Sequence, residues 1–168
     1  MGRPDGLVSI ASRHGPTIAT ETRVDRQALD DFLRRRHQAV LSTRRRDGTP
    51  QLSPVTMGVD PEGRIVVASY PERAKVANLR RHPAAAVCVL SDSFAGEWVQ
   101  VSGQADVVDL PDALEGLVDY FRAISGEHPD WDDYRQAMVD QGKVLIRLVP
   151  DQWGPISTGG FPARLAQS

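Results

Sequence analysis

Tight-turn signals separate three strand-like segments early in the chain, and this spacing constrains the fold more than any other feature. Residues 39–43 and 51–59 flank the pair Asp47 and Gly48, which is typical of a β-hairpin. A second turn, residues 60–63, leads into the strand-like residues 64–69. Strands joined by such short loops pair antiparallel, because a parallel crossover needs a dozen or more residues. The chain therefore starts as an antiparallel meander and not as a βαβ unit.

Further strands and helices follow with a mixed rhythm. Predicted strands span residues 84–90, 97–107 and 143–150, and Gly103 marks a site for a β-bulge. Predicted helices span residues 25–37, 73–83, 114–121 and 130–139. Asp25 and Asp130 suit N-cap positions, and the basic run 34–37 suits the end of the first helix. About six strands and four helices in this order predict an α+β fold, an antiparallel barrel with helical excursions.

Length and composition predict one folded domain. A chain of 168 residues supports a single core, expected over residues 25–155, with a flexible arm (1–24) and a tail (156–168). A net charge of −2 favours neither a nucleic-acid partner nor a membrane surface, and no signal peptide or transmembrane segment is recognisable. The single cysteine, Cys88, is interpreted as a small buried residue in an apolar run. One cysteine forms no intrachain disulfide, which fits a reducing cytoplasm.

Catalysis by protein side chains or by a bound metal is not predicted. The histidines have no metal-ligand spacing, and no HExxH, CxxC, G-x-S-x-G, Walker or GxGxxG motif occurs. Glu127, His128 and Asp130 could be taken for a catalytic cluster, but a polar loop before a helix N-cap is the simpler interpretation.

The segment from Ser69 to Pro83 is the best candidate for binding an anion. A strand ends at Ser69 and a helix begins near Arg73, so free N–H groups would lie beside the cations Arg73 and Lys75. Such an arrangement suits a phosphate, although a solvated basic helix face explains the same residues equally well. Arg80 and Arg81 are explained by the helix dipole and need no ligand.

The segment PQLSPVTM offers a second candidate surface. Gln51, Ser53 and Val55 share one face of the predicted strand, and Pro54 removes a backbone donor. These features suit an edge strand that lines a groove for a flat heterocycle. A plain surface strand remains the alternative.

Several blocks in one order resemble a known family. DGTPQLS, RAKVANLRR and GEHPDWDDYRQAMV, within residues 27–150, are similar to the deazaflavin (coenzyme F-420)-dependent reductases of class B. These belong to the pyridoxamine-phosphate-oxidase-like split-barrel superfamily. The resemblance implies a flavin-reductase-like split β-barrel and a homodimer with two cofactor sites at the subunit interface.

The resemblance also implies roles for individual residues. Gln51, Ser53 and Val55 would line the deazaflavin ring. Arg73, Lys75 and Asn78 would hold the phosphate and the start of the acidic tail. Trp98 matches a position on the strand that faces the other subunit. There it would either contact the cofactor or only pack in the interface. Trp131 and Tyr134 are expected to pack between helices.

The implied activity is hydride transfer from reduced coenzyme F-420 to a small unsaturated substrate of quinone, enone, lactone or bilin type, with the chemistry on the cofactor. An FMN-binding oxidase of the pyridoxamine phosphate type and a non-catalytic deazaflavin carrier remain alternatives. Haem is disfavoured, because no His or Cys is well placed as a ligand. Arg44, Arg45 and Arg46 form either a solvated turn or a contact for the polyglutamate tail, which FMN lacks.

Overall fold

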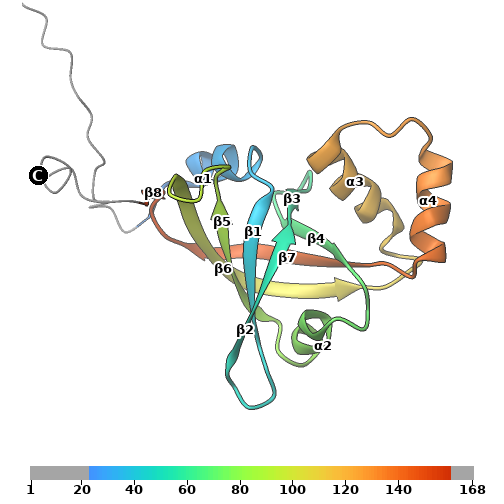
Figure 1. Ribbon diagram of the computed structural model, residues 1–168, viewed down its shortest axis with the longest axis horizontal. Helices are drawn as coiled ribbons and strands as arrows, with labels where there is room; N and C mark the ends of the chain where they lie inside the picture. Colours follow the sequence, from blue (N-terminus) through green and yellow to red (C-terminus); the bar gives the residue numbers. More distant parts are fainter. Residues whose placement is uncertain (1–22, 160–168) are drawn as a thin grey trace, which may run out of the picture.

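The computed structural model describes residues 23–159, which form one curled antiparallel sheet with four helices (Figure 1). Most of the predicted arm (1–24) and of the tail (156–168) lies outside these residues. The strands are β1 (Gln38–Arg44), β2 (Pro50–Thr56), β3 (Gly58–Val59), β4 (Ile65–Ser69), β5 (Ala84–Leu90), β6 (Glu97–Val108), β7 (Val144–Trp153) and β8 (Ser157–Thr158). The helices are α1 (Arg26–Leu33), α2 (Ala74–Arg81), α3 (Leu114–Ser125) and α4 (Trp131–Asp140).

The sheet has the order β2-β1-β5-β6-β7-β4-β3, with β8 paired to β6, and every pair is antiparallel. The curled sheet forms a half-barrel, so the predicted α+β split β-barrel is confirmed. The β1–β2 hairpin turns at Gly48, whose φ of 86° suits glycine. β2 occupies one end of the sheet, as expected for an edge strand.

The larger of two buried clusters packs the sheet against α1, and the smaller packs β4 and β7 against α3 and α4. Buried side chains alternate along β1 and β5, and those of Leu41, Val87 and Val89 join Leu29 and Leu33 of α1 in one cluster. The apolar run of β5 therefore has one buried face and one half-exposed face. Cys88 lies on the half-exposed face, so its interpretation as a buried residue was wrong.

A bulge in β6 confirms the role predicted for Gly103. The register against β7 shifts between Ser102 and Gly103. A Cβ atom at position 103 would overlap the carbonyl oxygen of Val149, so only glycine fits this approach of the two strands.

The first helix is shorter than predicted. Asp25 caps it as expected, accepting a hydrogen bond from the N–H of Ala28 at 2.8 Å, but α1 ends at Leu33. The chain then turns into β1, and the His37 carbonyl accepts a hydrogen bond from the N–H of Met57 at 2.8 Å. Residues 34–37 thus belong to the helix-to-sheet turn and not to the last helical turn.

α3 and α4 pack as a helical hairpin at one side of the sheet (Figure 1). Asp130 caps α4, and Tyr134 is buried with its hydroxyl donating to the carbonyl of Leu117 at 2.9 Å. The ring of Trp131 lies edge-on to that of Phe121. Trp131 and Tyr134 are therefore helix-packing residues, and the segment 127–130 is a polar loop before a helix cap, as predicted.

None of the helices within residues 23–159 is both long and apolar enough to span a bilayer.

Candidate functional site

The start of α2 is open to an anion. β4 ends at the buried Ser69, and a turn closed by the Arg73 N–H on the Tyr70 carbonyl (3.1 Å) leads into the helix. Arg73 occupies the N-cap position, where its side chain makes no capping hydrogen bond. The N–H of Val76 donates to the Arg73 carbonyl at 2.9 Å, so the N–H groups of Ala74 and Lys75 are the ones available to solvent or to a ligand.

Two cations lie at this helix start without acidic partners. Arg73 is exposed and Lys75 is half-buried, and neither forms an ion pair with a carboxylate of the described part of the chain. Burial and the nearby charge of Arg73 lower the pKa of Lys75. An anion bound here would neutralise both charges, so the donor set fits a phosphate.

Asn78 connects the helix to the hairpin. Its buried amide nitrogen donates to the hydroxyl of Thr43 and to the side-chain oxygen of Gln51, both at 3.0 Å. Its amide oxygen accepts from Arg81 at 2.6 Å. In this network Asn78 acts as a positioning residue, since every polar atom of its side chain is already bonded within the protein.

β2 presents its two faces to different surroundings. Gln51, Ser53 and Val55 are half-buried, and they stand opposite Thr43, Leu41 and Ala39 of β1. The alternate residues Leu52, Pro54 and Thr56 are exposed on the outer face of the sheet. The structure thus brings Gln51 into contact with Asn78, which lies one helical turn after Lys75 on α2. Ser53 and Val55 lie farther along β2, on the same face as Gln51.

The hairpin turn adds further positive charge. Arg44, Arg45 and Arg46 are exposed and form no ion pair within residues 23–159. A hollow of about 310 Å³ between the hairpin and β5 includes Arg44 and Gly48 in its lining. Arg80, in contrast, forms a bidentate ion pair with Asp109 at 2.7 and 3.0 Å, so its charge is balanced within the protein.

Trp98 lies apart from the other predicted site residues. It is on β6, three strands from β2 in the sheet order, which corresponds to roughly 14 Å across the sheet. Its register places it in the row of Thr56, at the opposite end of β2 from Gln51. Within one chain, Trp98 and the cluster at Asn78 form two separate places.

The outer face of the sheet carries two exposed large apolar side chains. Leu52 is 65% exposed and Trp98 is 36% exposed. Leu52 lines a shallow hollow of about 460 Å³, whose lining also includes Val40, Cys88 and Gln100. Burial raises the pKa of the Cys88 thiol, which therefore stays protonated at neutral pH.

Sequence reasoning missed Thr43 and Arg81 as members of the polar network. Thr43 is 3% exposed and faces the core. A polar residue at a core-facing position of an alternating strand was the available signal, because buried polar groups need partners.

The sequence profile of pyridoxamine 5'-phosphate oxidase matches residues 26–157. The chain belongs to this family. The match covers the whole sheet apart from the last residue of β8, and it includes both the α2 cluster and Trp98. The pyridoxamine 5'-phosphate oxidase family binds flavin-type cofactors, so membership confirms the superfamily expected from the sequence blocks.

Solved structures share the fold of this pyridoxamine 5'-phosphate oxidase family member. A conserved hypothetical protein from Mycobacterium tuberculosis superposes with a TM-score of 0.69 at 22% identity, covering 84% of this chain and 89% of that one. A protein described as F420 reductase superposes with a TM-score of 0.56 at 23% identity, covering 74% of this chain and 94% of that one. A heme binding protein from Mycobacterium smegmatis superposes with a TM-score of 0.56 at 18% identity, covering 77% of this chain and 54% of that one.

Proposed function

We propose that this protein is an oxidoreductase that binds coenzyme F-420 between two copies of the chain. It would reduce a small unsaturated organic compound of quinone, enone or bilin type. The observation that carries the proposal is the pair of unbalanced cations, Arg73 and Lys75, at the uncapped start of α2 beside the edge strand β2. The fold likeness to a protein described as F420 reductase supports the choice of cofactor.

The residues of the chain would divide the work of binding. Arg73, Lys75 and the first-turn N–H groups of α2 would hold the phosphate. Gln51, Ser53 and Val55 would contact the ring along β2, with Gln51 held in place by Asn78. When bound, the reduced coenzyme supplies a hydride, so no side chain needs to act as nucleophile.

A second copy of the chain would complete the site. The exposed apolar face around Leu52 suits a self-complementary contact. Trp98 of the partner subunit would then be supplied from across that contact, which accounts for its distance from Gln51 within one chain.

The test is a fluorescence titration of the full chain with coenzyme F-420 and, in parallel, with FMN. We expect tighter binding of coenzyme F-420. Arg73→Ala and Lys75→Ala should each weaken it by about 1–3 kcal/mol, or roughly 5- to 150-fold, because each removes a charge-assisted hydrogen bond. Arg34→Ala, which removes an exposed arginine on α1's far end, is the control and should change affinity less than about twofold.

Unchanged affinity in both variants would remove Arg73 and Lys75 from the phosphate site. Tighter binding of FMN would favour the alternative supported by the family match, an oxidase of the pyridoxamine phosphate type. Tight binding of coenzyme F-420 without turnover of quinones, enones or bilins would instead indicate a carrier protein.

A further inference from the structure

The edge strand β2 carries two prolines. It lies at one end of the sheet order and, within residues 23–159, pairs with β1 alone. Pro50 and Pro54 both belong to this strand, and both are exposed. An exposed strand edge offers a row of N–H and C=O groups to which another strand can add. Where the two prolines fall in that row decides whether β2 can accept such a strand.

Hydrogen bonds just beyond the two ends of the β1–β2 ladder show which way each backbone group of β2 points. The N–H of Arg45 donates to the carbonyl of Thr49 at 2.9 Å, and the N–H of Met57 donates to the carbonyl of His37 at 2.8 Å. Bonded and non-bonded rows alternate in an antiparallel pair. The odd-numbered residues of β2 therefore bond to β1, and the even-numbered residues direct their N–H and C=O groups to the free edge.

The even-numbered residues of β2 are Pro50, Leu52, Pro54 and Thr56. Both prolines thus occupy positions that face away from β1, where the missing N–H costs the existing ladder nothing. The carbonyl of Thr56 already accepts a hydrogen bond from the hydroxyl of Tyr120 at 3.1 Å. From position 50 to position 54, the N–H of Leu52 is therefore the one donor that the edge offers to a partner strand.

The two prolines are spaced symmetrically about Leu52, and this spacing bears directly on pairing between two copies. In an antiparallel pairing about a two-fold axis at Leu52, Pro50 of each copy lies opposite Pro54 of the other. Three bonded rows would normally form two hydrogen bonds each. Both outer rows would here lack every N–H, so only the central row would form its bonds. The carbonyls of the outer rows would lose water without gaining a donor, which is unfavourable.

The opposite end of the sheet order is closed by a different feature. β3 is only two residues long, and very short edge strands offer little backbone for pairing. Neither end of this seven-strand path is therefore suited to strand addition.

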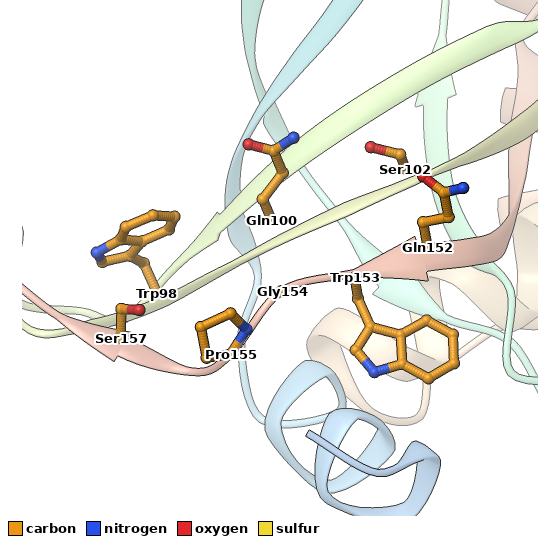
Figure 2. Close-up of a pocket in the computed structure, with 8 residues that line it drawn as sticks. All are labelled: Trp98, Gln100, Ser102, Gln152, Trp153, Gly154, Pro155 and Ser157. Carbon is orange, nitrogen blue, oxygen red and sulfur yellow. The ribbon is translucent and has the colours of Figure 1, made fainter. Parts of the chain in front are cut away.

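The outer face of the sheet, in contrast, offers side chains to a partner. Figure 2 shows Gln100, Ser102 and Gln152 extending to the same side of the ribbons. The amides of Gln100 and Gln152 are exposed, and neither bonds to another residue of 23–159. Contacts over this face need no backbone pairing between copies.

We propose that Pro50 and Pro54 block the addition of a strand from a second copy of this chain to the free edge of β2. Self-association is thereby confined to side-chain contacts on the faces of the sheet. The proposal concerns the backbone of one edge, so it does not depend on which cofactor the protein binds.

The test is the double variant Pro50→Thr/Pro54→Thr in the full chain. Threonine favours strands and restores an N–H at both positions. The variant is expected to fold, because both side chains are exposed and neither restored N–H faces β1. Light scattering after gel filtration over a concentration series should give a mass about twice that of the wild type or more. Urea denaturation verifies that the variant is folded.

Pro61→Thr/Pro71→Thr is the matched control, because these two prolines are exposed in turns outside the strands. It should keep the wild-type mass at every concentration. Pro54→Thr alone restores half of the missing donors, so its association should require a higher concentration than that of the double variant. This single variant also provides the test should the double variant fail to fold.

Amide hydrogen exchange locates the contact. In the associated double variant, the amides of residues 50, 52 and 54 should become protected as the concentration rises. A folded variant that keeps the wild-type mass at all concentrations would overturn the proposal. Association without protection of these amides, or equal association of the Pro61→Thr/Pro71→Thr control, would overturn it as well.

Discussion

Lys75 is a half-buried lysine whose positive charge is disfavoured by its burial. Burial first, and the charge of Arg73 second, lower its pKa from the ordinary value of 10.5. Lys75 therefore loses its positive charge at a lower pH than a solvated lysine does. Any anion held at the start of α2 depends on that charge.

We expect the affinity for coenzyme F-420 to fall as the pH rises through the alkaline range toward the ordinary lysine pKa of 10.5, because Lys75 loses its charge below that value. In Lys75→Arg the fall should be shallower over the same interval, because a guanidinium keeps its proton throughout. Fluorescence titrations at several pH values measure both profiles. Parallel profiles for wild type and Lys75→Arg would show that another group governs the pH dependence.

Position 103 requires glycine because of close packing, and not because of a positive φ angle. Gly103→Ala would drive a methyl group into the Val149 carbonyl, and we expect a loss of about 3 kcal/mol in the free energy of unfolding. Gly154→Ala, whose Cβ meets open space, should stay within about 0.5 kcal/mol of the wild type. Urea denaturation measures both. Similar midpoints for the two variants would mean that the bulge relaxes around the extra methyl group.

At the scale of elements, the β1–β2 hairpin places three arginines at the edge of the candidate site. Changing Arg44, Arg45 and Arg46 together to Ser should weaken the binding of coenzyme F-420 more than the binding of FMN, because coenzyme F-420 has an acidic tail and FMN has none. The difference should shrink at high salt, because these exposed charges are screened. Parallel titrations of both cofactors at low and high ionic strength test this. Equal losses would show that the hairpin does not contact the tail.

Local patterns predicted the elements better than their arrangement. Turn residues located the hairpin at Gly48, alternation and Gly103 located β6 with its bulge, and Asp130 located the start of α4. The end of α1 was misplaced, because His37 pairs with Met57 twenty residues later, and a helix dipole argument considers only the local sequence. The separation of Trp98 from Gln51 follows from β1 pairing with β5, which no local pattern encodes.

At the scale of the whole molecule, the outer face of the sheet is the surface expected to join two copies. Leu52 is central to the prediction, since this leucine is 65% exposed and lines a hollow that the expected self-association would cover. Leu52→Glu should weaken the dimer roughly 100-fold, about 3 kcal/mol, because a carboxylate would be buried without a partner. Light scattering after gel filtration measures the mass.

Phe94→Glu serves as the control for Leu52→Glu. Phe94 is 91% exposed in the loop between β5 and β6, outside the hollow, so its replacement should leave the mass unchanged. A wild-type protein that runs as a single chain at micromolar concentration would contradict the proposed dimer.

The bond from Trp153 to Val24 joins positions 129 residues apart and brings the two ends of the domain together. The guanidinium of Arg23 also lies 5.5 Å from the same indole ring. Neighbouring ends allow a circularly permuted chain, in which a short linker connects them and new termini open elsewhere. The exposed turn at Gly126, between α3 and α4, is suited to that opening, because it leaves every strand pairing of the sheet intact. The order in which the strands are synthesised could then be changed without altering which strands pair.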